Sequence, residues 1–393
     1  MKNYLLIPLA GRGQRFIDAG YKEPKQMISV NKRSCLEWSF DSLNSSNSQI
    51  IFIIRKETSN SFPNFKNFLK QVAGNNARIV EIDFETRGSL ETCALIAKSL
   101  EPDCTLSIFT GDVCFLPIYD PSAFIGTDLD GWVLSFKSNS NNYSYARVDS
   151  EGFATETAEK IVISEHALVG IYGFKSVEFF LKHAEITLSK APEFGGEYYI
   201  APIYNSILGA GGAVKVQPVI EMHLFGIPQE LNFFRSFSSK SFKPDKTIGL
   251  CSDHSGWRLK EDMKGLLTEL DISYIDFGAY VEVDSDYPDF VEPAMKSLLR
   301  GDVDYVFSSC RSGQGVNLSA SVFEGILAAL VYDLESASLA VKHSSANVFS
   351  FPSKIWNKQS IKDAISIIIS ERFEGGRHQG RIMKVVGEYI ENA

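Results

Sequence analysis

The chain has 393 residues, a formal net charge of -9 at pH 7 and 44% hydrophobic residues. This length exceeds what one hydrophobic core usually holds, so we expect two domains. The acidic balance gives no sign of a nucleic-acid-binding surface, and any phosphate site must be local. Because no apolar run approaches the roughly 18 residues of a membrane span, we also expect no membrane segment.

The N-terminus and the cysteines indicate a reduced, intracellular environment. Residues 1–11 combine a charged start with an apolar stretch, but this stretch is too short for a signal peptide and runs into glycines and arginines. The six cysteines are scattered, without the CxxC spacing that would favour zinc or a disulfide framework. We therefore expect a buried first strand and a cytoplasmic protein.

Short apolar runs alternate with helical segments along the first part of the chain. Strands are expected at residues 4–9, 50–54, 77–82, 106–110, 131–136, 144–148 and 168–174, and helices at 36–43 and 90–100. Such alternation favours a mostly parallel sheet that is covered on both faces.

The same pattern restarts after a linker. Residues 236–246 are rich in Ser and Lys and contain a proline, which is typical of a connecting segment. Beyond them, strands are expected at 247–251, 273–276, 305–309 and 326–331, and helices at 260–270 and 288–299. We therefore predict an α/β fold with two doubly wound, mostly parallel, Rossmann-like sheet domains in tandem, at 1–235 and 247–393.

The first expected strand ends in a glycine turn that suits a triphosphate. Gly11 and Gly13 lack a Cβ, so phosphate oxygens can approach the backbone N–H groups of the turn. Arg15 lies two residues further on, and Lys25 follows a proline in a second loop. Two cations near a glycine turn suit a polyanion whose leaving group is pyrophosphate. A surface turn with solvated Arg15 and Lys25 is the alternative.

This arrangement resembles the sugar-nucleotide pyrophosphorylase (nucleotidyltransferase) family, whose signature is a Gly-x-Gly-x-Arg turn followed by Pro-Lys. The resemblance covers roughly residues 1–235. It implies a Rossmann-like sheet and the attack of a sugar phosphate on the α-phosphate of a nucleoside triphosphate. It further implies nucleotide contacts from Ala10, Gly11, Gly13 and Gly88, catalytic roles for Arg15 and Lys25, sugar-phosphate contacts from Lys160 and Glu197, and Mg²⁺ binding by Asp112.

One departure from this family concerns the metal. Family members usually supply a second metal carboxylate just before a Gly-Thr turn, but the corresponding segment here, residues 222–228, contains no Asp. Two alternatives are open. Either Asp112 and the phosphates hold the metal alone, or Glu221 substitutes for the missing carboxylate.

The second part of the chain contains candidate groups for moving a carbonyl between C1 and C2 of a sugar. That reaction needs a base for the carbon-bound proton, donors for the enediolate oxygens and cations for the phosphate. Cys310 ends an expected strand and opens a loop whose Gly313 and Gly315 amides suit an anion hole, beside which a thiol can act as a base. A helix would place Arg377 and Arg381 on one face as a phosphate clamp.

Three segments, 252–256, 310–315 and 374–381, resemble the type B ribose-5-phosphate isomerase family, which includes the galactose-6-phosphate isomerase subunits. The resemblance runs from residue 247 to about 390. The family's site lies between two subunits, so a homodimer or a larger assembly is implied. By position, the resemblance implies that Cys310 is the enediolate base, that Ser312 polarises it and that His343 opens the furanose ring. It also implies that Asp253 binds ring oxygens or hydroxyls and that Gly313 and Gly315 contact the substrate. The phosphate would be held by His254, Arg377 and Arg381.

Departures from the isomerase pattern surround this second site. A large cation, Arg311, stands beside the base, where the family has glycine. Cys310 and His343 nevertheless remain, which favours an active isomerase with an altered substrate preference. The alternative is a non-catalytic domain that senses a sugar phosphate or assembles the protein. The other replaced positions, where the family has polar groups, are Ser321, Val322, Leu327 and Ser344.

Together the two resemblances predict a bifunctional enzyme that supplies an activated sugar, such as one for capsule or lipopolysaccharide. The C-terminal domain would interconvert an aldose and a ketose phosphate. The N-terminal domain would transfer NMP from a nucleoside triphosphate to a sugar phosphate with Mg²⁺. Type B isomerases handle 5- or 6-phosphates, whereas most pyrophosphorylases need a 1-phosphate. Either a separate mutase acts between the steps, or this transferase accepts a terminal phosphate, as cytidylyltransferases for polyols do.

Overall fold

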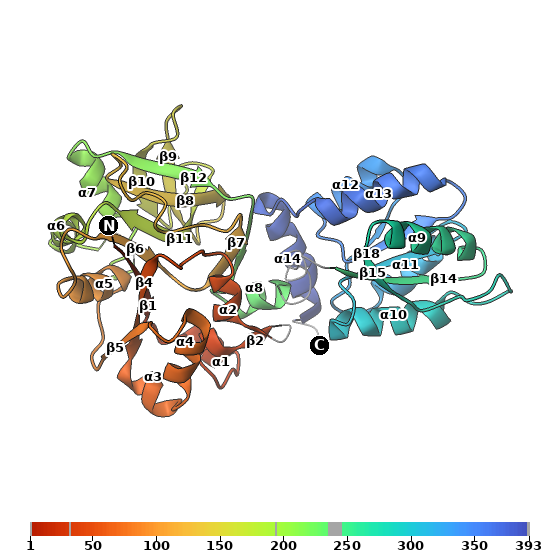
Figure 1. Cartoon of the computed structure of the whole chain (residues 1–393), viewed down its shortest axis with the longest axis horizontal. Helices are drawn as coiled ribbons and strands as arrows, with labels where there is room; N and C mark the ends of the chain where they lie inside the picture. The colour runs from red at the N-terminus through yellow and green to blue at the C-terminus, as the bar shows by residue number, and fades with distance from the viewer. Residues whose placement is uncertain (1, 31–32, 193–194, 235–245, 391–393) are drawn as a thin grey trace. The chain divides into compact units, whose positions relative to one another are not determined.

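The computed structural model describes residues 2–30, 33–192, 195–234 and 246–390, with the backbone alone at 376 and 386–390. Contacts between residues divide the chain into two compact units, Met1–Pro228 and Gln229–Ala393 (Figure 1). The predicted linker, residues 236–246, lies outside the described residues except for Lys246. Helix α8 (Pro228–Phe233) contributes to the second unit, because Phe233 packs against Phe373 with ring centroids 6.0 Å apart.

Nine strands of the first unit form one sheet. Its main path runs β10 (Ala154–Glu159), β9 (Ser144–Val148), β11 (His166–Phe174), β6 (Thr105–Phe109), β1 (Asn3–Leu9), β4 (Ser48–Arg55) and β5 (Arg78–Ile82), and β8 (Gly131–Lys137) and β12 (Val214–Pro218) join it through β11. The four strands from β6 to β5 are parallel. β11 runs antiparallel to β6, β8 and β9, so the sheet has a parallel half and a mixed half.

Both faces of this sheet are covered, because successive strand residues point to opposite sides. Tyr4 and Leu6 of β1 pack in a cluster with helices α5 (Ser89–Ala97), α6 (Val177–Leu188) and α7 (Ile203–Gly209). Leu5 and Ile7 pack on the other face with helices α2 (Cys35–Phe40) and α4 (Phe65–Ala73). The other elements are α1 (Gln14–Asp18), η1 (Lys25–Met27), β2 (Ser29–Val30), β3 (Arg33–Ser34), α3 (Lys56–Ser61), β7 (Val113–Leu116) and β13 (Glu221–Leu224).

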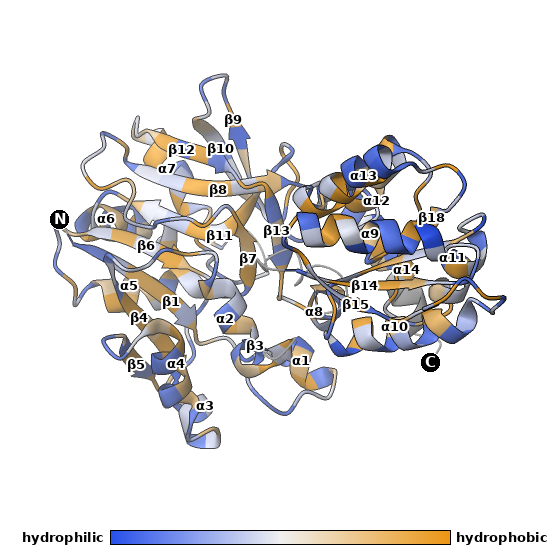
Figure 2. Ribbon diagram, turned by 45° about the vertical axis from the view of Figure 1, so that its right-hand side comes forward, coloured by the Kyte–Doolittle hydropathy of each residue, from blue (hydrophilic) through white to orange (hydrophobic). Residues whose placement is uncertain are grey.

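The second unit is built on a smaller sheet of five parallel strands. Their order is β15 (Ser273–Asp276), β14 (Thr247–Ser252), β16 (Tyr305–Cys310), β18 (Val348–Pro352) and β17 (Ala328–Leu330). Helices α9 (Trp257–Glu269), α12 (Leu334–Lys342) and α13 (Lys358–Ser370) pack on one face, and α10 (Pro288–Arg300) and α11 (Gln314–Ser321) on the other. Helix α14 (Gly376–Ile390) follows. Figure 2 shows the hydrophobic colour in strand β14, between helices that also carry hydrophilic stretches.

The predicted fold class is confirmed, since both units are α/β sheets with helices on both faces. The main difference lies in the first sheet, where β11 breaks the parallel order. The expected strand at 326–331 is shorter, as β17. In the two large sheets, β10, β12 and β18 have no counterpart among the expected strands, and neither do the short strands β2, β3, β7 and β13. The Thr and Glu residues of β10 interrupt any apolar run, and β18 contains a serine and ends in a proline, which argues against a central strand.

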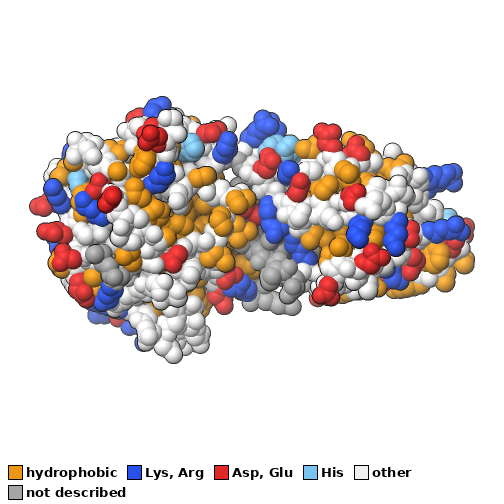
Figure 3. All heavy atoms as spheres, turned by 45° about the horizontal axis from the view of Figure 1, so that its top comes forward, with side chains coloured by type: hydrophobic (Ala, Val, Ile, Leu, Met, Phe, Trp, Pro, Cys, Tyr) orange, Lys and Arg blue, Asp and Glu red, His pale blue; other side chains and the backbone are white. Residues whose placement is uncertain are grey.

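The surface and the helix lengths bear on the expected partners. On the face shown in Figure 3, acidic and basic side chains are interspersed over both units. The net charge of -9 is therefore not gathered into a single patch on that face. Among the described residues, no helix combines the length and the apolar character needed to cross a membrane.

Candidate functional site

Each sheet changes winding direction between two neighbouring parallel strands, and the predicted site residues follow those strands. In the first sheet, β1 lies between β4 and β6, so the loops after β1 and β6 leave a crevice. In the second sheet, β14 lies between β15 and β16 in the same way. Ligands of open α/β sheets bind at such switch points, outside the carboxyl ends of the strands. Both candidate sites therefore occupy the position that this architecture provides.

The glycine turn after β1 is exposed, and the backbone conformation at one of its positions favours glycine. A Cβ on Gly11 would meet nothing within 4 Å, and Gly13 has a φ of +65°, which disfavours other residues. Between them, Arg12 donates from Nε and Nη2 to the two carboxylate oxygens of Glu85, at 3.1 and 3.0 Å. Arg15 is exposed in the short helix α1. The turn is thus open to an approaching phosphate.

Lys25 and Asp112 meet beside this turn, although they lie far apart in the sequence. Lys25 Nζ donates to Asp112 Oδ2 at 2.9 Å, and the two side chains are 18% and 27% exposed. Burial alone would raise the pKa of Asp112, but the charge of Lys25 and hydrogen bonds from Thr110 and Lys25 outweigh it and lower that pKa. Asp112 is therefore an ionised carboxylate with an ammonium group at its side.

The donor set at Asp112 fits Mg²⁺, whereas Glu221 does not complete it. Mg²⁺ is commonly held by one or two carboxylates together with substrate phosphates. Glu221 is buried with its Oε1 2.8 Å from Nε2 of His223, opposite Leu116 of β7. Phe225, four residues later, donates its N–H to the carbonyl of Asp112. Glu221 therefore lies about 13 Å along the strand from the level of Asp112.

The predicted sugar-phosphate residues converge on a tyrosine. Lys160 Nζ donates to Tyr199 Oη at 2.8 Å, and the nearby Glu197 raises the pKa of that hydroxyl. Glu159, buried at the end of β10, accepts a hydrogen bond from Ser144. A hollow that opens to solvent is lined by Glu159, Glu197 and Tyr199. This hollow offers charged and hydroxyl groups to a polar ligand.

Gly88, which the family resemblance assigns to nucleotide contacts, connects its segment to this region. Its φ is +138°, and a Cβ there would lie 2.5 Å from the carbonyl oxygen of Tyr198. Two backbone hydrogen bonds flank the contact, from Tyr198 N to Arg87 O (2.7 Å) and from Leu90 N to Tyr198 O (3.0 Å). Glycine is required here because the two backbones approach so closely. Ala10 precedes the glycine turn and packs against the core cluster.

In the second unit, hydrogen bonds tie the loops after β14 and β16 together. The Arg311 N–H donates to Ser255 Oγ at 2.8 Å, and that hydroxyl donates to Asp253 Oδ1 at 2.7 Å. Cys310, the last residue of β16, is buried at 5% exposure. Ser312 is exposed, and its Oγ accepts a hydrogen bond from the Gln314 N–H at 3.4 Å. Asp253 and Cys310 therefore flank one crevice, with Arg311 beside it.

Glycines and a histidine complete this crevice. Gly313 caps helix α11 with a φ of +71°, and a Cβ on Gly315 would lie 2.7 Å from the ring of Tyr287. Helix α11 therefore begins at a close packing contact and presents its first amides toward the loop. His254 is held by Ser285, whose N–H donates to His254 Nδ1 at 3.1 Å. Asp253, His254, Cys310, Gly313 and Gly315 thus share one edge of the sheet.

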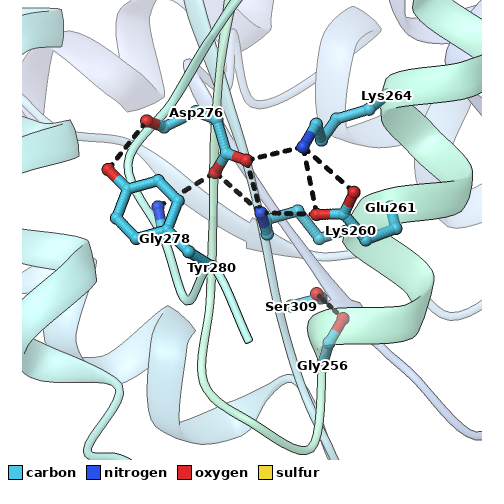
Figure 4. Close-up of polar contacts among 8 residues, drawn as sticks. All are labelled: Gly256, Lys260, Glu261, Lys264, Asp276, Gly278, Tyr280 and Ser309. Carbon is cyan, nitrogen blue, oxygen red and sulfur yellow. Dashed lines mark hydrogen bonds and ion pairs between the residues drawn. The ribbon is translucent and has the colours of Figure 1, made fainter. Parts of the chain in front are cut away.

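A buried ion cluster supports this edge (Figure 4). Lys260, with 0% exposure, donates to both carboxylate oxygens of Asp276 at 2.7 and 2.6 Å. Lys264 lies 2.9 Å from the same carboxylate, and the Gly278 N–H donates to it at 2.9 Å. Burial would raise the pKa of Asp276, but the bonds from Lys260, Gly278 and Lys264 lower it. This cluster fixes α9 and β15 against each other.

Asp276→Asn is expected to lower the free energy of unfolding by about 3 kcal/mol at pH 7, because it leaves the buried Lys260 without its main counter-charge. A lowered folded-state pKa stabilises the fold above the ordinary value of 3.8, and this stabilisation is lost as pH falls. The wild-type protein should therefore lose stability in acid more steeply than the variant. Urea unfolding at several pH values measures this, with the exposed Asp262→Asn as control. Equal pH slopes in both variants would contradict the assignment.

His343 lies in a second cluster with the start of α14. Its ring stacks on His378, with centroids 4.0 Å apart and planes at 9°, and Glu374 Oε2 lies 3.6 Å from His343 Nε2. Burial lowers the pKa of His378, as do the charges of His343, Arg377 and Arg381. The possible donor atoms of His343, Glu374 and His378 lie within 4.8 Å of one another. Near-parallel rings do not aim their lone pairs at one point, and two arginines disfavour a cation, so the cluster suits an anion.

Cys310 lies at the carboxyl ends of the strands of the second sheet, and His343 lies at their amino ends. In the parallel register of β16 and β18, Cys310 is opposite Pro352, the last residue of β18. His343 is the C-cap of helix α12 and lies in the loop that leads to the first residue of β18, Val348. The length of β18 thus separates them, roughly 13 Å. The structure therefore divides the predicted isomerase residues of one chain into two groups, with Arg377 and Arg381 beside His343 and the other predicted residues beside Cys310.

Three residues of these sites were not predicted from the sequence. Tyr199 follows Glu197 by two residues, and only the tertiary contact with Lys160 reveals it. Ser255 lies within the Asp-His-Ser-Gly segment, and His378 lies between Arg377 and Arg381. Polar residues inside a recognised motif are the signal that could have found these two.

Comparison with known proteins finds separate matches for the two parts of the chain. A model of the Ribose/Galactose Isomerase family matches residues 248–385. Ribose-5-phosphate isomerase B of Escherichia coli is 31% identical over 137 residues, which cover 35% of this chain and 92% of that protein. A probable ribose-5-phosphate isomerase B of Mycoplasma genitalium is 36% identical over 142 residues, which cover 35% of this chain and 93% of that protein.

The first unit is similar to a solved transferase structure. The nucleoside-diphosphate-sugar pyrophosphorylase from Vibrio cholerae RC9 matches with 26% sequence identity and a TM-score of 0.52, over 59% of this chain and 99% of that chain. The N-terminal unit is therefore nucleotidyltransferase-like. Through residues 248–385 the chain belongs to the ribose/galactose isomerase family, fused behind that unit in one polypeptide.

Proposed function

We propose that the protein is a bifunctional enzyme of activated-sugar biosynthesis. The first unit would transfer NMP from a nucleoside triphosphate to a sugar phosphate, and the second would interconvert aldose and ketose phosphates. The observation that carries the first activity is the contact of Lys25 with Asp112 at 2.9 Å beside the glycine turn. It supports a site in which cations face a triphosphate at the switch point of the sheet.

In the proposed transfer, an oxygen of the sugar phosphate attacks the α-phosphorus of the triphosphate. The new O–P bond forms as the bond to the bridging oxygen breaks, and pyrophosphate leaves with its electron pair. The amides at Gly11 and Gly13 and the guanidinium of Arg15 would hold the triphosphate. Lys25 would stabilise the charge that builds on the α-phosphate oxygens. Lys160 and Glu197 would hold the phosphate and hydroxyls of the sugar phosphate.

Asp112 would hold Mg²⁺ together with phosphate oxygens, and the bound ion would neutralise phosphate charge. Two features of the chain prepare Asp112 for this role. Hydrogen bonds and the charge of Lys25 lower its pKa, so the carboxylate is ionised at neutral pH. Its position after β6 places it across the crevice from the glycine turn.

In the proposed isomerisation, the sulfur of Cys310 takes the proton from the carbon next to the carbonyl and returns it to the former carbonyl carbon, while the hydroxyl proton passes from one enediolate oxygen to the other. The amides at Gly313 and Gly315 would bind the enediolate oxygens, and Asp253 the substrate hydroxyls. Ser312 would polarise the thiol. His343 would first open the sugar ring, with His254, Arg377 and Arg381 holding the phosphate. Because Cys310 and His343 lie at opposite sheet edges, a complete site would need two copies of the chain.

The test is pyrophosphate release by the purified chain with Mg²⁺, for each of CTP, UTP, GTP, ATP and dTTP against pentose and hexose 1-phosphates and terminal phosphates. Release with a terminal phosphate such as ribulose 5-phosphate would join both units in one consecutive pathway. Release with 1-phosphates alone would call for a mutase between the steps. Absence of release with every pair would refute the transferase function.

A second candidate function keeps the transferase and makes the C-terminal unit a sensor of sugar phosphates. One observation favours it. Leu327, which stands where the family has a polar residue, packs in an apolar cluster with Phe233 and Phe373. Helix α8 thus covers a surface that carries a polar group in the isomerase pattern. Binding of ribose 5-phosphate without conversion to ribulose 5-phosphate would support the sensor.

A further inference from the structure

Tyr199 occupies the meeting point of the two groups predicted to hold the sugar phosphate. Its hydroxyl oxygen accepts a hydrogen bond from Lys160 Nζ at 2.8 Å. The same ammonium nitrogen lies 4.5 Å from the centroid of the Tyr199 ring, within the range of a cation–π contact. The carboxylate of Glu197 lies near the same hydroxyl and raises its pKa. One phenol therefore contacts the ammonium of Lys160 and interacts with the carboxylate of Glu197.

The hydroxyl of Tyr199 is protonated and has a defined direction. Burial raises its pKa, and the interaction with Glu197 and the charge of Glu159 raise it further. A protonated phenol that accepts from an ammonium group donates its own proton to a carboxylate. The hydroxyl thus accepts from Lys160 and has its own proton available for the carboxylate of Glu197.

The backbone of Lys160 has an uncommon conformation. Lys160 has a φ of +55°, in the left-handed region that residues other than glycine adopt only when the surroundings impose it. Its N–H donates to the carbonyl of Tyr143 at 3.0 Å, which holds the backbone in that conformation. The side chain leaves this turn toward Tyr199. A long ammonium side chain in such a turn gains a fixed direction from the phenol.

Tyr198, the residue before Tyr199, is anchored to the segment around Gly88. Its backbone is bonded to Arg87 and Leu90 on both sides of Gly88. Its hydroxyl donates to the carbonyl of Lys190 at 2.7 Å. The backbone at Tyr199 is thereby held in place, and its phenol is a stable reference for Lys160 and Glu197.

We propose that Tyr199 is a positioning residue of the transferase site, whose hydroxyl sets the separation between the ammonium of Lys160 and the carboxylate of Glu197. The ligand class that fits this pair is a polyhydroxylated compound with a phosphate group, because the ammonium binds phosphate and the carboxylate accepts from hydroxyls. The proposal rests on the transferase function of the first unit. It predicts that Tyr199 acts on the sugar phosphate and leaves the nucleotide unaffected.

The first test is the kinetics of Tyr199→Phe in the full chain, which keeps the ring and removes the hydroxyl. With the substrate pair selected by pyrophosphate release, KM for the sugar phosphate should rise about tenfold, because a hydrogen bond to a charged group is lost. KM for the nucleoside triphosphate should change less than about twofold. The matched control is Tyr4→Phe, which removes a buried hydroxyl bonded to Glu101 at the amino end of β1. An unchanged KM for the sugar phosphate, or an equal rise for both substrates, would overturn the proposal.

The second test needs neither ligand nor turnover. Acetic anhydride modifies lysines, and mass spectrometry of the peptide with Lys160 reports how restrained that side chain is. Tyr199→Phe should raise the modification rate of Lys160 severalfold, whereas Tyr4→Phe should leave it unchanged. An unchanged rate in Tyr199→Phe would overturn the positioning role, whatever the protein catalyses. A protein without pyrophosphate release but with a raised Lys160 rate would lose the transferase function and keep the positioning role.

Discussion

Lys25→Ala is expected to lower the rate of pyrophosphate release by about 100- to 1000-fold, the usual cost of removing one preorganised group that stabilises transition-state charge. Lys25 is the ammonium group that contacts Asp112, at 2.9 Å, so its loss removes the cation nearest to the candidate metal carboxylate. The effect should fall on kcat, because the charge of the α-phosphate grows only as the new bond forms. Steady-state kinetics with the selected substrate pair measure it.

Two measurements separate this catalytic effect from a folding defect. Lys22→Ala removes an exposed lysine three residues earlier in the same loop and should retain wild-type activity. The isomerase rate of Lys25→Ala should also equal that of the wild-type protein, because Cys310 and His343 belong to the other unit. A Lys25→Ala protein that keeps most of its pyrophosphate release would refute the assigned role.

Cys310→Ala is expected to lower the aldose–ketose isomerisation rate by about 100- to 10,000-fold, the range that general base catalysis contributes. The carbon-bound proton then has no base at the end of β16. Cys251→Ala in the neighbouring strand β14 is the control. Burial raises the pKa of Cys251 to about 12, so this thiol remains protonated and has no place in proton transfer. The conversion of ribose 5-phosphate, followed by the appearance of ketose, measures both variants.

A mixture of Cys310→Ala and His343→Ala proteins extends this prediction. Each variant alone should be inactive as an isomerase. If a complete site takes Cys310 from one chain and His343 from another, a random dimer mixture should recover about a quarter of the wild-type rate, because half of the dimers carry one intact site of two. No recovery after subunit exchange would place both residues in the site of a single chain, against their separation across the sheet.

Local sequence patterns were sufficient for the class of the fold. The strands β1, β4, β14 and β16 are apolar runs because both of their faces are buried, and such runs are visible without the structure. β10 and β18 could not be recognised in this way. β10 is identified by its pairing with β9, and β18 by its register with β16 and β17.

For the candidate sites, the sequence by itself determined the residue types and their order. The Gly-x-Gly turn, Pro-Lys, Asp112, Cys310 and the two arginines of α14 belong to short segments whose chemistry does not depend on distant contacts. Only the tertiary structure decided which of them meet. It brought Lys25 to Asp112 and Lys160 to Tyr199, placed Glu221 away from Asp112, and put His343 at the sheet edge opposite Cys310. The physical reason is that parallel sheets pair segments distant in the sequence, and strand register then sets the edge that each loop occupies.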